Sequence, residues 1–111
     1  MEFTVQELEQ GIAVVRGAGR LNMVSAGQLR ELVAASVAGG SSRIIVDLSA
    51  VEFIDSSGLG ALVNGLKIAR QAGGDLRISA PTDQVKLVLQ LTNMERVLFP
   101  YPTVAAAYAN D

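Results

Sequence analysis

Cysteine and histidine are both absent from the 111 residues of this chain. Without cysteine there is no disulfide framework, no thiol nucleophile and no zinc–thiolate site. Without histidine the chain lacks the side chain that most often serves as general base or metal ligand, and a Ser-His-Asp triad is impossible. We therefore predict that the protein is not an enzyme and carries neither a metal nor another cofactor.

Charge is also sparse, since charged residues make up 18% of the chain and the net charge is -2. A nucleic-acid partner would call for a basic face, which this balance argues against. The N-terminal residues lack the basic and then apolar pattern of a signal peptide, and no apolar run approaches the roughly 18 residues of a membrane span. We expect a soluble, cytoplasmic protein with neither nucleic acid nor membrane as a partner.

Half of the residues are apolar, which is enough for one ordinary core. We predict a single domain over residues 1–111, without repeats or an internal linker. Short apolar runs, alternating at residues 3–8, and the turn signals around them predict strands at residues 3–8, 12–16, 43–48 and 76–80. Helical spacing predicts helices at residues 25–37, 57–72, 83–91 and 104–109, with Ser25, Asp83 and Thr103 as candidate caps of the first, third and fourth.

The order of these elements, β-β-α-β-α-β-α-α, indicates the fold class. Strands that alternate with helices imply a largely parallel sheet with crossover helices, and the first hairpin adds an antiparallel edge. Residues 43–48 are apolar at successive positions, which predicts a strand covered on both faces, whereas residues 17–22 read as a loop. The prediction is an α/β fold with a single four-stranded, mixed but mostly parallel sheet and about four helices.

Two glycine patterns come close to phosphate-binding motifs without matching them. Residues 17–19 read Gly-Ala-Gly after a strand, but the dinucleotide pattern needs a third glycine where this chain has Asn22. Gly60 and Gly65 have the spacing of a phosphate loop, yet the required Lys-Ser/Thr pair does not follow them. We interpret these residues as packing glycines.

The most informative segment is VEFIDSSGLG at residues 51–60, where an apolar run ends and a helix begins. One interpretation of its Asp-Ser-Ser turn is structural, because a Ser or Asp at a helix start accepts an orphan N–H bond and contributes about 1 kcal/mol. Glycines at positions 58 and 60 would then let the helix approach a neighbouring strand. The other interpretation is functional, with one hydroxyl facing water and accepting a phosphate that the helix dipole favours.

A phosphate at this turn would add nearly two negative charges beside Asp55. Inside a protein interface those charges would repel acidic groups and cost desolvation, so the modification would act as a release switch with little refolding. The following helix has an apolar stripe that we assign to the core, made of Leu59, Leu62, Val63 and Leu66. Ala61, Asn64 and Ile68 lie off this stripe and are candidates for a partner surface.

Residues 44–60, IIVDLSAVEFIDSSGLG, closely resemble the signature of bacterial anti-sigma factor antagonists, which are STAS domains. The segment GRLN at residues 19–22 is similar to the loop after the family's second strand, and GGDLRI at residues 73–78 to its helix end and fourth strand. Residues 85–99 look like the third helix and the turn toward the last. The resemblance covers nearly the whole chain, and the central motif is its specific part.

The resemblance implies a STAS fold and a phosphorylation-switched binding module. In this family the unphosphorylated protein binds an anti-sigma factor, a GHKL-type serine kinase, which frees the sigma factor for transcription. The kinase phosphorylates the first serine of the motif, and a PP2C-type phosphatase resets it. Carried over, the phosphorylation site is Ser56, Ser57 is a neighbouring hydroxyl better suited to capping, and Asp55, Gly58 and Leu59 shape the docking surface of a protein expected to be a monomer.

One position departs from the family pattern. Where this chain has Asn22, the family usually carries an aspartate near the phosphorylation site and the kinase interface. Asparagine keeps the shape and hydrogen bonding of aspartate but loses its charge, which bears on the choice of kinase and on competence as a substrate. Less repulsion near Ser56 could also leave the phosphorylated form binding more tightly than is usual in the family.

Two rival functions remain open on the sequence. STAS domains also bind the ATPase of lipid ABC transporters or form the tails of anion transporters, and the lack of an apolar span argues against the tail. The chain could instead be a subunit of a larger stress-sensing or partner-switching assembly.

Overall fold

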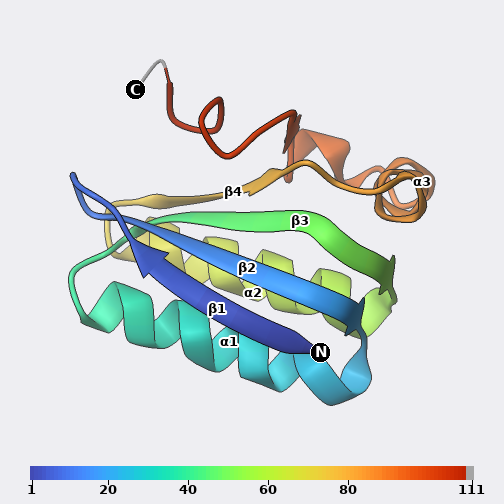
Figure 1. The fold of residues 1–111 in the computed structure, drawn as a ribbon, viewed down its shortest axis with the longest axis horizontal. Helices are drawn as coiled ribbons and strands as arrows, with labels where there is room; N and C mark the ends of the chain where they lie inside the picture. Colours follow the sequence, from blue (N-terminus) through green and yellow to red (C-terminus); the bar gives the residue numbers. More distant parts are fainter. Residues whose placement is uncertain (110–111) are drawn as a thin grey trace.

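The computed structural model describes residues 1–109, which form a five-stranded sheet with helices along one face (Figure 1). In chain order the elements are β1 (Glu2–Glu7), β2 (Ile12–Leu21), α1 (Met23–Ala38), β3 (Arg43–Ile54), α2 (Ser56–Gln71), β4 (Asp75–Ser79), α3 (Asp83–Leu91), the 3-10 helix η1 (Met94–Arg96) and β5 (Pro100–Tyr101). The strands lie in the order β1-β2-β3-β4-β5, with β1 antiparallel to β2 and the other pairs parallel. The predicted α/β class and antiparallel edge are confirmed.

The prediction of four strands is wrong by one, because the short strand β5 pairs in parallel with the end of β4. Pro100 faces Ile78 in this pairing. A proline lacks the backbone N–H, but on an edge strand one missing donor is tolerated. Two prolines near each other suggested a chain break, which hid this strand from pattern analysis.

The predicted fourth α-helix at residues 104–109 is also wrong. These residues form consecutive turns, closed by bonds such as the one from the Ala107 N–H to the Val104 carbonyl at 3.2 Å. Thr103 nevertheless caps the first turn, since its Oγ1 accepts a hydrogen bond from the Ala106 N–H at 3.1 Å. The described residues therefore contain three α-helices and η1.

Residues 17–22 are mostly strand rather than the predicted loop. β2 runs on to Leu21 beside β3, which itself continues to Ile54, six residues beyond its predicted end at position 48. The register between the two strands shifts after Arg16 and again after Gly19, whose φ of 115° suits glycine. Glycine weakens the strand pattern locally, while a paired neighbour holds the segment extended.

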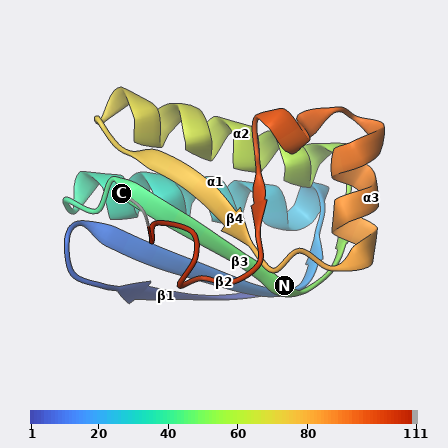
Figure 2. The same cartoon turned by 90° about the horizontal axis from the view of Figure 1, so that it is seen from above.

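The helices α1 and α2 lie side by side against one face of the sheet (Figures 1 and 2). The core between them and the sheet holds most of the fully buried apolar side chains, among them Val15, Leu21, Leu29, Val33, Ile44, Val46, Leu48, Ile54, Leu62, Leu66, Leu76 and Ile78. A Cβ on Gly65 would lie 2.9 Å from Leu76 Cδ1, so the glycine lets α2 approach β4 closely. Gly65 is thus a packing glycine, as predicted.

The opposite face of the sheet is partly covered by the C-terminal segment, which crosses above β3 in Figure 2. Val14, Ile45 and Ala107 form a second small buried cluster there. Ile44 and Ile45, which point to opposite faces, are at most 2% exposed. The prediction that residues 43–48 form a strand covered on both faces is therefore confirmed.

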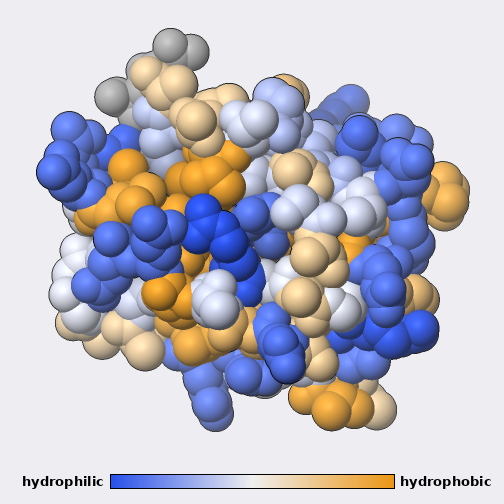
Figure 3. Space-filling view, viewed as in Figure 1, coloured by the Kyte–Doolittle hydropathy of each residue, from blue (hydrophilic) through white to orange (hydrophobic). Residues whose placement is uncertain are grey.

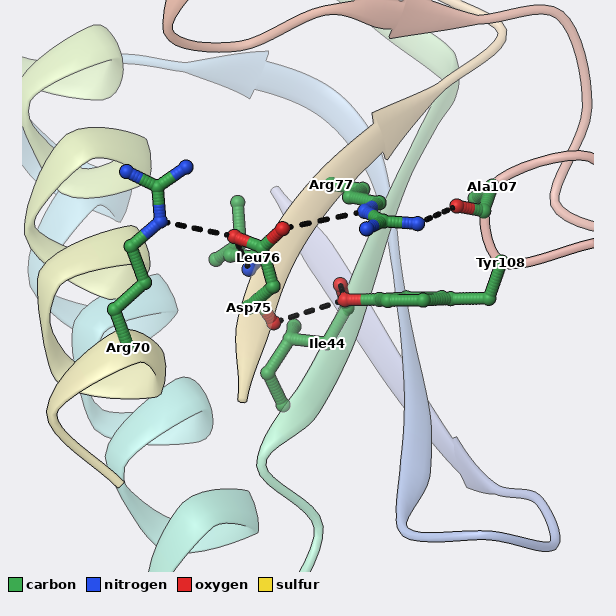
Figure 4. Close-up of polar contacts among 7 residues, drawn as sticks. All are labelled: Ile44, Arg70, Asp75, Leu76, Arg77, Ala107 and Tyr108. Carbon is green, nitrogen blue, oxygen red and sulfur yellow. Dashed lines mark hydrogen bonds and ion pairs between the residues drawn. The ribbon is translucent and has the colours of Figure 1, made fainter. Parts of the chain in front are cut away.

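A polar network ties this segment to the amino ends of the parallel strands (Figure 4). The Tyr108 hydroxyl lies 2.9 Å from the Asp75 carbonyl oxygen and 3.1 Å from that of Ile44, and both accept from it. The Asp75 carboxylate accepts from Arg70 Nε and Arg77 Nε at 3.2 Å each, and Arg77 Nη1 donates to the Ala107 carbonyl at 2.7 Å. The network joins α2, β3, β4 and the C-terminal turns.

The surface is a mixture of polar and apolar patches, with apolar areas over α3 and at the end of the molecule where α1 begins (Figure 3). Within the part of the chain that the structure describes, no helix has the length and apolar character that crossing a membrane would require.

Candidate modification and docking site

The Asp-Ser-Ser turn lies at the carboxyl ends of the parallel strands, beside the turn that follows β2. Leu21 ends β2 and Ile54 ends β3, and the Asp55 N–H donates to the Leu21 carbonyl at 3.3 Å. Both strands lead directly into helices, so the N-termini of α1 and α2 lie next to each other. In parallel α/β sheets this edge is the usual place for a binding site.

Asn22 caps α1, and the predicted role of Ser25 as the cap residue is wrong. The Asn22 Oδ1 accepts from the Val24 N–H at 3.0 Å and from the Ser25 N–H at 3.3 Å. Ser25, the third residue of the helix, completes a capping box because its Oγ accepts from the Asn22 N–H at 3.0 Å. Its Oγ also donates to the Arg20 carbonyl at 2.8 Å, which fixes the end of β2.

Asp55, rather than Ser57, caps α2, and its carboxylate also reaches α1. One oxygen, Oδ1, accepts from the Gly58 N–H at 2.9 Å, and the other, Oδ2, accepts from the Met23 N–H at 3.3 Å. A carboxylate has two acceptor oxygens whereas a serine hydroxyl has one, so only Asp55 can join both helix starts. Asp55, which was predicted to shape a docking surface, therefore links the N-termini of α1 and α2.

Ser56 is the first residue of α2 and its side chain is exposed, while Ser57 is half-buried. Within residues 1–109 neither hydroxyl takes part in a hydrogen bond, since the capping positions are occupied by Asp55 and Asn22. The Ser56 oxygen is therefore accessible and unconstrained, as a phosphorylation site requires.

The next two predicted site residues lie below the surface. Gly58 is buried, and a Cβ on it would lie 2.3 Å from the Leu21 carbonyl oxygen. Leu59 is 9% exposed and belongs to the core under the helices. The role of Gly58 and Leu59 in docking stays a prediction. In the structure, they pack the first turn of α2 against the end of β2.

Gly60 does not make the close approach to a strand that the sequence suggested. A Cβ on it would have only Arg30 Nη2 within 4 Å, at 3.9 Å. The third helix also differs in its cap, because Thr82 occupies the position predicted for Asp83 and donates from Oγ1 to the Val51 carbonyl at 2.8 Å. The described residues contain no group of three or more His, Cys, Asp or Glu side chains that could hold a metal ion.

The family model described as STAS domain matches residues 5–107. The chain belongs to the STAS domain family. Among proteins of known sequence, a Thermotoga neapolitana homolog of the protein TM1081 is 40% identical over 68 residues, or 61% of this chain and 60% of that relative. Its name classes it with the anti-sigma factor antagonists. The chain thus spans somewhat less than two thirds of the length of the curated relative it matches.

Solved structures share the fold of this STAS domain. The crystal structure of TM1081 from Thermotoga maritima has a TM-score of 0.87 at 30% identity, covering 96% of this chain and 92% of that one. The unphosphorylated form of SpoIIAA, named an anti-sigma factor antagonist, has a TM-score of 0.77 at 21% identity, covering 89% of this chain and 87% of that one. A phosphorylated form of SpoIIAA has also been solved. At that identity the SpoIIAA likeness shows the fold alone.

Two residues of this STAS domain that sequence analysis missed lie at the site. Met23 and Val24, in the first turn of α1, are 76% and 88% exposed. They follow the cap residue Asn22, whose Oδ1 accepts from the Val24 N–H, and the Met23 N–H donates to Asp55. We call Met23, Val24, Asp55 and Ser56 together the switch surface. The only sign of this exposed pair in the sequence was that two adjacent apolar residues come just before a predicted helix.

The partner surface predicted on α2 is only partly accessible in this STAS domain. Ala61 is fully buried in the main core, so its prediction as a partner residue is wrong. Asn64 is exposed and Ile68 is half-buried. Alanine is small enough to lie at the contact between two helices, where a longer side chain would force them apart.

Proposed function

We propose that this STAS domain is an anti-sigma factor antagonist whose binding is switched off by phosphorylation of Ser56. The observation that carries the proposal is the exposed, unbonded Ser56 hydroxyl at the start of α2, next to the start of α1, which presents two exposed apolar side chains, Met23 and Val24. Exposed apolar groups beside a modifiable polar group suit a reversible protein interface. The family and the names of its relatives support the same role.

The partner in this proposal is an anti-sigma factor that is itself a GHKL-type serine kinase. The kinase transfers the γ-phosphoryl group of ATP to Ser56 Oγ, forming the new P–O bond and releasing ADP and the hydroxyl proton. A PP2C-type phosphatase hydrolyses the phosphoserine and restores binding. In this cycle the STAS domain is a cytoplasmic binding module and a kinase substrate rather than an enzyme.

The switch works through charge because the surrounding structure is already fixed. Asp55 is engaged with both helix starts, and Asn22 is engaged in its own cap. A phosphate at Ser56 adds about 1.5 to 2 negative charges at pH 7 and must lose water to stay inside an interface. Binding therefore weakens without rearrangement of the fold, and Met23 and Val24 can no longer be buried against the partner.

Asn22 acts first as a helix cap in this proposal. Aspartate and asparagine cap helices about equally well, so the replacement costs the fold little. It removes one negative charge from the edge of the switch surface. We infer that Asn22 tunes which kinase docks there, rather than deciding whether the surface forms.

Affinity capture from a lysate of the native host tests the proposal. Wild type, Ser56→Asp and the control Ser49→Asp are compared, because Ser49 is an exposed serine on β3 well removed from the switch surface. We expect wild type and Ser49→Asp to capture a GHKL-type kinase and Ser56→Asp to lose it. Capture of that kinase by all three proteins would contradict the switch, and capture of a lipid-transporter ATPase would favour the rival function.

A further inference from the structure

The helix face that carries Ser56 also carries Gly60, one turn further along α2. Side chains four residues apart on a helix lie about 5–6 Å from each other between Cβ atoms. Gly60 has no side chain, so the surface beside Ser56 is open toward α1. The guanidinium of Arg30 lies over that opening, with Nη2 3.9 Å from the position of a Cβ on Gly60.

The packing of the two helices explains how Arg30 reaches this place. α1 and α2 lie side by side and begin at the same end of the sheet, where the Asp55 carboxylate binds the Met23 N–H (Figure 2). Long side chains on a helix lean toward its N-terminus, which is the direction from Gly60 to Ser56. Arg30 is exposed, and within residues 1–109 it makes no hydrogen bond or ion pair. Its donors are therefore available.

We propose that Arg30 binds the phosphoryl group of phosphorylated Ser56. The planar guanidinium offers paired N–H donors that match two phosphate oxygens, and such charge-assisted pairs are short and strong. The inference rests on the proposed modification of Ser56. It assigns a phosphate-binding role to a residue of α1 that lies outside the sequence motif.

The pair holds the phosphate across the gap between α1 and α2. The phosphate then lies over Gly60, on the helix side of the switch surface, instead of extending freely into solvent. The positive charge of Arg30 also offsets part of the repulsion between the phosphate and the neighbouring Asp55 carboxylate. The fold thus tolerates the modification while the charged group covers the surface that a partner would need.

The other charged groups at this end of the molecule come from four elements. Asp55 caps α2, Glu52 lies near the end of β3, Asp83 begins α3 and Arg20 lies near the end of β2. Arg20 is stacked on the Phe53 ring, with its guanidinium carbon 4.3 Å from the ring centroid. Because Leu21 beside it points into the helix-side core, Arg20 projects from the opposite face of the sheet. It is therefore the matched control.

The test is a phosphorus NMR titration of the full chain with phosphoserine encoded at position 56, so no kinase is needed. The second pKa of a free phosphoserine is about 6, and a neighbouring cation lowers it. We expect Arg30→Gln to raise this pKa by at least about half a unit relative to wild type. Arg20→Gln should leave it unchanged within the error of the titration, and Arg30→Lys should fall between wild type and Arg30→Gln.

Coinciding titration curves for wild type, Arg30→Gln and Arg20→Gln would overturn the proposal. Equal shifts in both glutamine variants would also overturn it, since they would report only the net charge of the protein. Amide NMR spectra of the unphosphorylated variants check that each is folded. The outcome is separate from the proposed function, because binding to a kinase is measured with other samples and neither result depends on the other.

Discussion

The two ends of the parallel sheet use their polar side chains in opposite ways. At the amino ends of the strands, Asp75 and Tyr108 are bonded to neighbours from four different elements, and Arg70 and Arg77 are paired with the Asp75 carboxylate (Figure 4). At the carboxyl ends, the Asn22 and Asp55 side chains mainly accept from backbone N–H groups, and Asn22 Oδ1 also accepts from Ser25 Oγ at 3.4 Å.

This contrast separates the part of the domain that stabilises the fold from the part that is available for binding. The amino end closes the fold by holding the C-terminal segment on the sheet. The carboxyl end is held by bonds from Asn22 and Asp55 to backbone N–H groups, and it leaves the Ser56 hydroxyl and the Met23 and Val24 side chains exposed. Changes at the amino end should therefore affect stability alone, and changes on the switch surface should affect binding.

The largest expected effect comes from the point where α2 is seated on β2. We predict that Gly58→Ala lowers the free energy of unfolding by about 3 kcal/mol, because the new Cβ would meet the Leu21 carbonyl oxygen at 2.3 Å. Gly60→Ala is the matched control and should raise stability by about 0.5 to 1 kcal/mol, as glycine is unfavourable inside a helix. Urea denaturation of both variants measures this, and similar stability of the two would show that the contact is not tight.

Removal of the carboxylate that joins the two helix starts should have the next largest effect. We predict that Asp55→Ala lowers the free energy of unfolding by about 2 kcal/mol, since the N–H groups of Gly58 and Met23 lose their acceptor. Asp55→Asn keeps one acceptor oxygen and should retain roughly half of the contribution. An alanine variant as stable as wild type in thermal and urea unfolding would mean that the bridge between α1 and α2 contributes nothing.

The apolar part of the switch surface can be tested without disturbing the fold. We predict that the double variant Met23→Ser/Val24→Ser binds the captured partner about tenfold more weakly, because less apolar area is removed from water in the complex. Its unfolding free energy should change by less than about 0.5 kcal/mol per substitution, as both side chains are exposed. Calorimetry with the purified partner gives the affinity.

Leu91→Ser is the control for that experiment, because Leu91 is 75% exposed on α3 and lies outside the switch surface. We expect its affinity to equal that of wild type. An equal loss of affinity in Leu91→Ser and the double variant would place the interface more widely over the domain and would remove the distinction between the two ends.

The smallest predicted effect lies at the amino end. Tyr108→Phe should lower the free energy of unfolding by about 1 kcal/mol, since the Ile44 and Asp75 carbonyls lose the donated hydroxyl. Tyr101→Phe is the control, because the Tyr101 hydroxyl makes no hydrogen bond within residues 1–109 and its removal should change little. Partner affinity should be unaffected in both, and a loss of binding in Tyr108→Phe would show that the two ends are coupled.

Much of the fold was predictable because its signals are local. The successive apolar residues within positions 43–48 predicted a doubly covered strand, and the periodicity of α2 predicted its buried stripe. The predicted ends of strands were wrong where pairing with a strand distant in the sequence overrides the local pattern. Gly17 and Gly19 read as loop residues, yet Gly17 pairs with β1 and Gly19 with β3, which keeps both in a strand. Pro100 reads as a break, yet it pairs with β4 at the edge of the sheet.

The order of strands and helices as far as α3, the lack of thiol and imidazole groups and the motif around Ser56 could be read from the sequence, because each depends on neighbouring residues or on composition. Three features became apparent only in the folded chain: the Asp55 carboxylate bonds to the starts of two helices, Met23 and Val24 are exposed to solvent, and Arg30 lies over Gly60. Those contacts join residues about thirty positions apart, and no local pattern records which side chains the packing of α1 against α2 will bring together.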